Sequence, residues 1–236
     1  MTPVAPAAAP MPALPFAAVL FDCDGVLVDS EPITLGVMRD VFAEHGWEMS
    51  QAECTARFLG RQLSDDAADI ERHTGVPFPR LQAAFRARRD AALAARVRPI
   101  DGIAEVLPVL YRAYGGRIAC ASGSDRGKLD VMLGTAGLAR WFEGGRLLSG
   151  TEMPRGKPAP DVYLAAAAAL GVAAADCAVV EDTRTGATAG LTAGATVFGY
   201  CPGGPGHDSA RQLREAGVRH LFHDMRQLPA LLGVAG

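Results

Sequence analysis

Two carboxylates, Asp22 and Asp24, stand one residue apart at the end of the apolar run Val19–Phe21. Gly25 follows them directly and allows the backbone to turn sharply. The apolar run predicts a buried strand, and two neighbouring carboxylates at its end are costly to bury unless a positive charge lies between them. Oxygen ligands of this kind suit Mg²⁺. The sequence therefore predicts a metal-assisted aspartate site at the end of a strand.

Three further segments carry polar side chains shortly after short apolar runs. Ser122 and Gly123 follow the second run, and Lys157 follows the third after a connection. Glu181 and Asp182 follow the fourth run. Because the carboxyl ends of parallel strands meet at one edge of a sheet, we expect these side chains to lie close to the first two carboxylates. One pocket would then hold a nucleophile, a hydroxyl group, a lysine and further carboxylates.

Each of these residues taken alone also has a purely structural interpretation. Ser122 fits a turn or a helix cap, Lys157 fits a solvated surface charge, and Glu181 fits a helix N-terminus. A calcium loop of the EF-hand type is excluded, because its required glycine and glutamate positions hold Leu27 and Ile33. The functional interpretation rests on the order of the four segments and on their common place after predicted strands.

The elements that would position these residues follow from the alternation of apolar runs with helical periodicity. Strands alternating with helices predict an α/β fold, a doubly wound parallel sheet covered by helices on both faces. The predicted strands are residues 17–21, 117–121, 146–149, 177–180, 195–200 and 220–222, and the predicted helices are residues 103–112, 128–137, 161–170, 185–193, 209–216 and 225–232.

A block of different character interrupts this alternation after the first strand. Its apolar residues recur at three and four spacing between many charges, and glycines mark its turns, which predicts about four helices. We therefore expect a helical cap at residues 32–99, inserted into a Rossmann-like core made of residues 15–31 and 100–236. Residues 1–14 are rich in alanine and proline and are expected to be a disordered lead-in.

Composition limits the classes of function. The chain of 236 residues is 49% hydrophobic and 21% charged, with a formal net charge of −3. This balance gives no basic surface for nucleic acid or membrane lipid. The five cysteines are scattered without a Cys-x-x-Cys pair, which disfavours disulfides and zinc and is typical of the reducing cytoplasm. No heptad seam is visible, and we expect a cytoplasmic monomer that acts on a small molecule.

Four segments together resemble the haloacid dehalogenase superfamily of phosphohydrolases. They are FDCDGVLVDSE (21–31), AS (121–122), GKPAPD (156–161) and VED (180–182), in the order of that family. The helical block directly after the first segment is similar to the cap of the subgroup that contains beta-phosphoglucomutase and phosphoglycolate phosphatase. The resemblance extends over nearly the whole chain from Pro15 to Leu232.

The resemblance implies a role for each core residue. Asp22 would attack phosphorus and form an aspartyl-phosphate, and Asp24 would serve as general acid and then general base. Mg²⁺ would be bound by Asp22, the backbone carbonyl of Asp24 and Asp182, with Glu181 as a ligand or directly behind the ligands. Lys157 would neutralise charge on the nucleophile and on the phosphoryl oxygens.

The resemblance also implies groups that bind the substrate. The hydroxyl of Ser122 and the amide of Gly123 would donate hydrogen bonds to the phosphoryl oxygens. The segment FLGRQ (58–62) is similar to the specificity loop of the cap. Gly60 and Arg61 would contact the distal part of the substrate, with Arg57 as a second candidate. A surface arginine paired with Glu53 or Asp65 is the alternative interpretation.

The leading interpretation is a magnesium-dependent phosphatase of a small phosphomonoester such as a sugar phosphate, phosphoglycolate or a nucleotide. Asp24 favours phosphoryl transfer, because a dehalogenase has no alkoxide to protonate. The alternative is a phosphosugar mutase of the beta-phosphoglucomutase type, which carries Ser-x-Ser-Lys after the second strand; here Asp125 occupies the lysine position, which weakens that alternative. A third hypothesis is a non-catalytic phosphate-binding protein, but Asp22 and Asp24 are both present.

Overall fold

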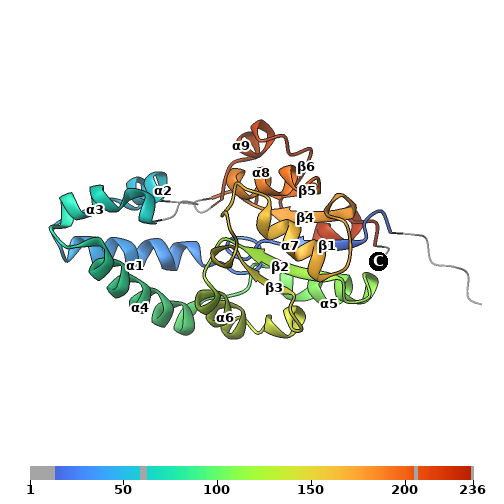
Figure 1. Cartoon of the computed structure of the whole chain (residues 1–236), viewed down its shortest axis with the longest axis horizontal. Coiled ribbons are helices and arrows are strands. Elements are labelled where there is room, and N and C mark those ends of the chain that lie inside the picture. Colours follow the sequence, from blue (N-terminus) through green and yellow to red (C-terminus); the bar gives the residue numbers. More distant parts are fainter. Residues whose placement is uncertain (1–13, 59–62, 205–206, 235–236) are drawn as a thin grey trace, which may run out of the picture.

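The computed structural model describes residues 14–58, 63–204 and 207–234. Within these residues a sheet of six parallel strands has the order β3-β2-β1-β4-β5-β6, so the predicted doubly wound α/β fold is confirmed (Figure 1). The strand order reverses direction next to β1, which places β1 at the centre. The strands are β1 (Ala18–Phe21), β2 (Ile118–Ser122), β3 (Leu147–Ser149), β4 (Cys177–Glu181), β5 (Thr196–Tyr200) and β6 (His220–Phe222).

Both faces of the sheet are buried, and β1 shows why the strands read as continuous apolar runs. Val19 and Phe21 belong to the apolar cluster on one face, whereas Ala18 and Leu20 belong to the cluster on the other. The first cluster includes α5 (Ile103–Ala113), α6 (Arg126–Thr135) and α10 (Leu228–Leu231). The second includes α7 (Asp161–Ala169), α8 (Arg184–Thr192) and α9 (Ala210–Glu215).

The predicted closing helix at 225–232 is shorter than expected. The structure divides it into a 3₁₀ turn, η5 (Met225–Gln227), and α10. Pro229 lies in the first turn of α10, where its missing N–H costs no helical hydrogen bond, so the helix begins there. All five cysteines of the chain are buried and free. No helix within the described ranges is both long and apolar enough to span a bilayer.

Four helices lie between β1 and α5 at one end of the elongated molecule (Figure 1). We call the described residues of 31–96 the helical insert. It has an apolar cluster of its own, to which Met38, Phe42, Ile70 and Phe85 contribute. The predicted boundaries of a cap at 32–99 stay a prediction, and the predicted lead-in lies outside the described residues except for Leu14. The helices are α1 (Glu31–Ala43), α2 (Gln51–Phe58), α3 (Ala67–Thr74) and α4 (Phe78–Arg96), with the 3₁₀ turn η1 (Leu63–Asp66) between α2 and α3.

The chain enters and leaves the helical insert at one place. The amide of Asp29 donates a hydrogen bond of 2.9 Å to the carbonyl of Arg98, and the amide of Ile100 donates one of 3.0 Å to the carbonyl of Leu27. The outgoing and returning segments are therefore paired side by side.

Candidate active site

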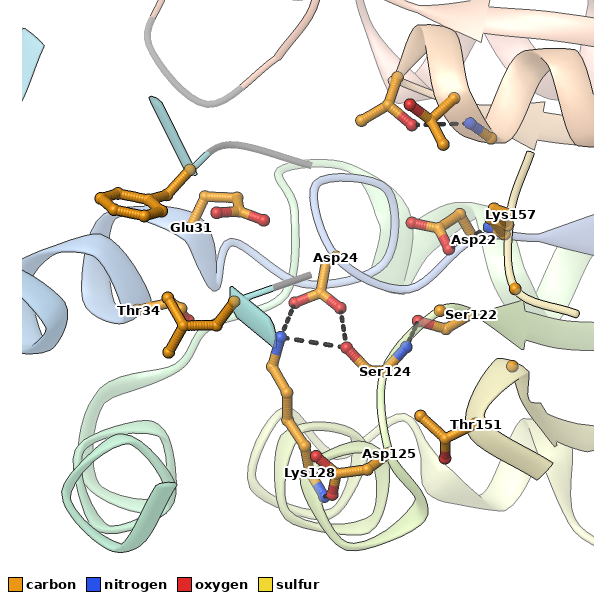
Figure 2. A pocket seen from close by; sticks show the side chains of 18 of the residues that line it. Asp22, Asp24, Glu31, Thr34, Ser122, Ser124, Asp125, Lys128, Thr151 and Lys157 are labelled. Atoms are coloured by element: carbon orange, nitrogen blue, oxygen red, sulfur yellow. Dashed lines mark hydrogen bonds and ion pairs between the residues drawn. The ribbon is translucent and has the colours of Figure 1, made fainter. Parts of the chain in front are cut away.

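A cavity of about 600 Å³ lies between the carboxyl ends of the strands and the helical insert (Figure 2). Asp22 follows β1, Ser122 ends β2, Asp182 follows β4, and Lys157 arrives on the connection after β3. All of them line the cavity, as does Gly123. The topology thus brings together the core residues that the sequence singled out, because these strands are neighbours in the parallel sheet.

Lys157 is the cation at the centre of this group. Its side chain is 9% exposed, and its ammonium donates hydrogen bonds of 2.7 Å to Asp22, 2.6 Å to Glu181 and 2.9 Å to the hydroxyl of Tyr163. Burial alone would lower the pKa of Lys157, but the attraction of Asp22 and Glu181 outweighs burial and raises the pKa well above its usual range. The lysine therefore stays charged against the nucleophile candidate.

Glu181 is fully buried and accepts hydrogen bonds from within the protein on both of its oxygens. Oε1 accepts from Lys157 and from the hydroxyl of Tyr163 at 2.7 Å. Oε2 accepts from the amides of Asp182 and Thr183 at 3.1 and 3.2 Å, and from the hydroxyl of Thr183 at 3.0 Å. These five hydrogen bonds favour the supporting role of Glu181 over that of a metal ligand, because little acceptor capacity remains.

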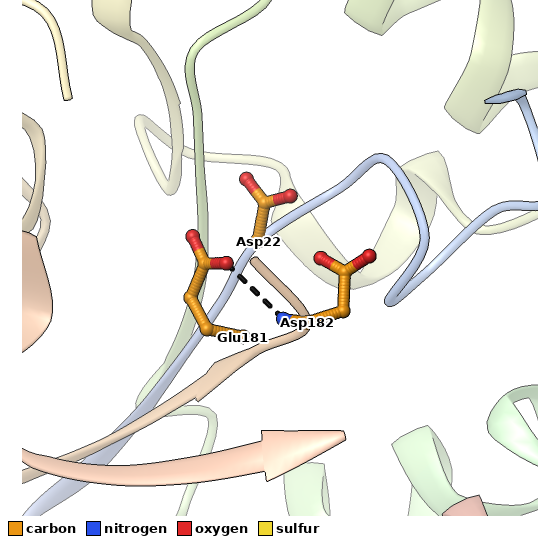
Figure 3. A group of neighbouring side chains, drawn as sticks. All are labelled: Asp22, Glu181 and Asp182. Atoms are coloured by element: carbon orange, nitrogen blue, oxygen red, sulfur yellow. Dashed lines mark hydrogen bonds between the residues drawn. The ribbon is translucent and has the colours of Figure 1, made fainter. Parts of the chain in front are cut away.

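Asp182 is the carboxylate best placed to bind a cation. Asp22, Glu181 and Asp182 each offer an oxygen within 4.8 Å of the others (Figure 3). The Oδ1 atom of Asp182 is buried and has no hydrogen-bond partner among the described residues. Gly25, at φ +76°, packs so closely that an added Cβ would lie 2.1 Å from Oδ2 of Asp182. A buried, unpartnered carboxylate oxygen beside two further acids fits a divalent cation.

The carboxylates also raise one another's pKa values. Burial raises the pKa of Asp22 to about 7; Lys157 opposes this effect, and Glu181 and Asp24 add to it. Burial, Glu181 and Asp22 raise the pKa of Asp182 well above its usual range. A bound cation would favour the ionised forms, so the electrostatics and the unpartnered oxygen point to the same chemistry.

Asp24 is surrounded by donors (Figure 2). Oδ2 accepts a hydrogen bond of 2.7 Å from Ser124, and Oδ1 accepts from Lys128 at 2.7 Å and from Ser30. Burial raises the pKa of Asp24, but Lys128 and the hydroxyl donors outweigh burial and lower it. The amide of Ser124 in turn donates to the hydroxyl of Ser122 at 3.1 Å. The structure therefore holds Asp24 as a carboxylate.

Lys128 is a residue that the sequence analysis missed. The sequence analysis considered only Asp125 at the lysine position of this segment and did not consider Lys128 three residues further on. Asp125 is the N-cap of α6 and accepts a hydrogen bond of 2.9 Å from the amide of Lys128, which places Lys128 in the first helical turn. Lys128 is only 7% exposed and lines the cavity. An aspartate just before a predicted helix was an available signal for this cap.

The helical insert contributes its own polar groups to the cavity. Gln82, Arg86 and Arg89 lie on one side of α4 and line the cavity. Arg89 is 7% exposed and donates a hydrogen bond of 3.2 Å to Asp125, which joins α4 to α6. These positions were not predicted, because helical periodicity shows only that a face is shared, not what it faces.

The predicted cap residues have different outcomes. Gly60 and Arg61 lie outside the described residues. Arg57 pairs with Asp69, and its guanidinium lies 4.9 Å from the ring centroid of Trp47. Arg57 does not line the cavity and is a structural residue of the helical insert, paired with an acid other than those expected.

Comparison with known proteins gives concordant results. A family model for haloacid dehalogenase-like hydrolases matches residues 16–194. The 6-phosphogluconate phosphatase of Escherichia coli K12 is 30% identical over 186 residues, which cover 78% of this chain and 82% of the relative. A solved haloacid dehalogenase family hydrolase from Deinococcus radiodurans R1, with bound phosphate and sodium, is 38% identical with a TM-score of 0.77 and covers 93% of this chain and 96% of its own. A structure from Thermotoga maritima assigned as a beta-phosphoglucomutase is 21% identical with a TM-score of 0.74, covers 92% of this chain and 98% of its own, and has the same fold.

Proposed function

Because the chain belongs to the haloacid dehalogenase-like hydrolase family, we propose that it is a magnesium-dependent phosphatase that hydrolyses a small phosphomonoester through an aspartyl-phosphate. The observation that carries this proposal is the 2.7 Å contact between Lys157 and Asp22, beside the unpartnered oxygen of Asp182. Asp22 would then be the nucleophile and Asp182 a metal ligand, with the charged Lys157 beside them. The substrate would be a sugar phosphate, phosphoglycolate or a nucleotide.

The residues present fit Mg²⁺. Asp22 and Asp182 would hold the ion with the backbone carbonyl of Asp24, and Glu181 would support them from behind. All of these donors are oxygens, which magnesium prefers over nitrogen and sulfur. When bound, the ion would offset the repulsion between the anionic nucleophile and the anionic phosphate. The Deinococcus relative has bound phosphate and sodium, which supports a protein that takes a phosphate group and a metal cation.

In the first half of the reaction, an oxygen of Asp22 would attack phosphorus while the bond to the leaving alkoxide breaks. Asp24 would donate a proton to that alkoxide. An incoming phosphate raises the proton affinity of Asp24 by like-charge repulsion and competes for Lys128, which prepares Asp24 to act as an acid. The hydroxyl of Ser122 and the amide of Gly123 would donate to the phosphoryl oxygens.

In the second half, water would attack the phosphorus of the aspartyl-phosphate, and its proton would pass to Asp24. The bond between phosphorus and Asp22 would break, releasing phosphate and restoring the carboxylate. The helical insert would cover the cavity and exclude water during the first half. Gly60 and Arg61 remain candidates for contacts with the distal part of the substrate.

The proposal is tested with p-nitrophenyl phosphate and purified protein. We expect hydrolysis that requires Mg²⁺, disappears in Asp22→Asn and persists in the control Asp130→Asn, whose side chain is exposed. Mass spectrometry of an acid-quenched reaction should find one phosphate on the peptide that contains Asp22. Turnover by Asp22→Asn at the wild-type rate would contradict the proposal.

One observation supports a phosphosugar mutase as the second candidate. Lys128 brings an ammonium group into the cavity from the segment in which Asp125 occupies the lysine position of the mutases. A mutase would pass the phosphoryl group from Asp22 to another sugar hydroxyl instead of to water. Interconversion of sugar 1- and 6-phosphates that requires a bisphosphate primer would favour it, whereas release of inorganic phosphate favours the phosphatase. We further propose a cytoplasmic monomer, supported by the five free cysteines for the location.

A further inference from the structure

The segment that follows β5 contacts the site, and the proposed reaction does not use it. Nε2 of His207 lies 3.0 Å from the carbonyl oxygen of Gly25. A carbonyl oxygen can only accept a hydrogen bond, so Nε2 carries the proton and donates it. The same nitrogen lies 3.9 Å from Oδ2 of Asp182. His207 therefore contacts the turn that follows Asp24 and lies close to the carboxylate of Asp182, the proposed metal ligand.

The next residue, Asp208, forms a hydrogen bond with the backbone of Asp182. The amide of Asp208 donates a hydrogen bond of 3.2 Å to the carbonyl of Asp182. The carboxylate of Asp208 accepts one of 2.6 Å from the amide of Arg184, at the start of α8, and one of 3.0 Å from Gln212 on α9. The segment after β5 is thus anchored to α8 and α9 on one side and to Asp182 on the other.

The imidazole of His207 is held firmly in place. Its side chain is 11% exposed, and its ring meets the ring of Tyr200 edge-on with 5.7 Å between centroids. Nδ1 is buried and has no hydrogen-bond partner within the described part of the chain. When the proton is on Nε2, no N–H of the ring lacks an acceptor. This tautomer therefore costs less free energy to bury than the one with the proton on Nδ1.

Gly25 and Asp182 are in close contact, so the position of the Gly25 turn affects the carboxylate of Asp182. An added Cβ at Gly25 would lie 2.1 Å from Oδ2 of Asp182, so the two groups already touch. A small displacement of the Gly25 turn therefore moves the carboxylate of Asp182 or opens a gap beside it. His207 is the side chain that ties the carbonyl of Gly25 in place.

We propose that His207 is a positioning residue of the metal site, whose Nε2–H fixes the Gly25 turn against the carboxylate of Asp182. The inference rests on the proposed function, because it assigns His207 to the site that would bind Mg²⁺. Groups that orient metal ligands in this way typically change metal affinity by about 10- to 100-fold when they are removed. A ring that merely fills space beside Tyr200 would not have this effect once its volume is restored.

Two variants separate the hydrogen bond from the packing. His207→Leu fills most of the volume of the ring but has no N–H. His207→Gln places an amide nitrogen near the position of Nε2, and can still donate to Gly25. His45→Leu is the control, because His45 is an exposed histidine of the helical insert away from the cavity. If His207→Leu does not fold, His207→Asn replaces it, since the shorter amide cannot reach Gly25.

The measurement is the dissociation constant of Mg²⁺ without substrate, by isothermal titration calorimetry on the full-length protein. We expect it to rise about 10- to 100-fold in His207→Leu and to stay within about threefold of wild type in His207→Gln and His45→Leu. The KM for p-nitrophenyl phosphate at saturating Mg²⁺ should change little.

Wild-type affinity in His207→Leu would overturn the inference and leave the proposed function intact. Equal losses in the leucine and glutamine variants would also overturn it, because packing of the ring would then explain the effect. A wild-type protein that binds no Mg²⁺ would contradict the proposed function itself and, with it, this inference.

Discussion

The ammonium of Lys128 donates a hydrogen bond of 2.7 Å to the carboxylate of Asp24, although 104 positions separate the two residues in the chain. The pair joins the first turn of α6 to the turn that follows β1. Lys128 also donates to Ser124 at 3.1 Å, so its position is fixed by two partners. This contact gives the proposed general acid and base a charged neighbour that the sequence did not reveal.

Replacing Lys128 should therefore impair catalysis more than folding. We expect Lys128→Met to lower kcat by about 10- to 100-fold, less than the roughly 100- to 10,000-fold that positioned proton transfer contributes, because Asp24 itself remains. Steady-state kinetics with p-nitrophenyl phosphate measures the effect. Arg126→Met is the matched control on the same turn, because Arg126 pairs with Glu152 at the surface. Unchanged kcat in Lys128→Met would show that Asp24 does not need this partner.

Stability should depend on pH through Asp22 when no metal ion is bound. The pKa of this carboxyl is about 7 in the folded protein, against 3.8 for an ordinary aspartate, because the group is buried. The folded protein thus keeps a proton that the unfolded chain releases above pH 4, so this contribution to stability falls as pH rises from about 4 to 7. Mg²⁺ should restore it at high pH by favouring the ionised form.

Urea unfolding of wild type and Asp22→Asn in the presence of EDTA isolates this contribution. Relative to the variant, wild type should lose on the order of 2 to 3 kcal/mol of unfolding free energy between pH 5 and pH 8. Parallel pH profiles for the two proteins would mean that Asp22 titrates alike in the folded and unfolded states.

Replacing Gly186 and replacing Gly36 by alanine should change the unfolding free energy in opposite directions. A Cβ at Gly186 would lie 1.6 Å from Oε1 of Glu181, so the side chain of Glu181 would be displaced from Lys157. Gly36, inside α1, has no atom within 4 Å of an added Cβ. We expect Gly186→Ala to lower the unfolding free energy by on the order of 3 kcal/mol, and Gly36→Ala to raise it by about 0.5 to 1 kcal/mol. Thermal and urea unfolding measure both, and a neutral Gly186→Ala would contradict the tight packing behind Glu181.

Arg86 should affect the binding of extended substrates. It faces the cavity from α4, whereas Arg88 points away and pairs with Glu44 at the surface. We expect Arg86→Ala to raise the KM for the best sugar phosphate found in a substrate panel by about 10- to 100-fold, the loss of a hydrogen bond to a charged group. Arg88→Ala should leave KM unchanged. If both variants behave as wild type across a panel of phosphorylated substrates, the distal part of the substrate does not contact Arg86.

The core of the site could be predicted because each of its residues follows an apolar run. Asp22, Ser122 and Glu181 lie at the ends of neighbouring strands, and the parallel topology brings such ends together without any knowledge of loop conformation. Lys157 is separated from the third apolar run by a connection, so its expected place near the other residues depended on topology less directly than theirs and was supported by the resemblance to a family. The same logic could not find Lys128, because a lysine three residues into a helix usually faces solvent.

The cavity wall formed by the helical insert was harder to predict for a related reason. Helical spacing places Gln82, Arg86 and Arg89 on one side of α4, but the angle at which α4 approaches α6 decides what they face. His207 lies in a connecting segment without periodicity, where a contact with Gly25 depends on the path of the loop. Side chains at strand ends are thus fixed by topology, and the others by tertiary packing.

Because the backbone is paired at Leu27–Ile100 and at Asp29–Arg98, the chain leaves the sheet for the helical insert and returns from it at the same place. Changes in the length or sequence of the helical insert would alter the cavity wall that α4 contributes without shifting the register of β1, because the chain returns beside the point where it left. The shape of the cavity can therefore vary independently of Asp22, Lys157 and Asp182, which the strand ends hold in place.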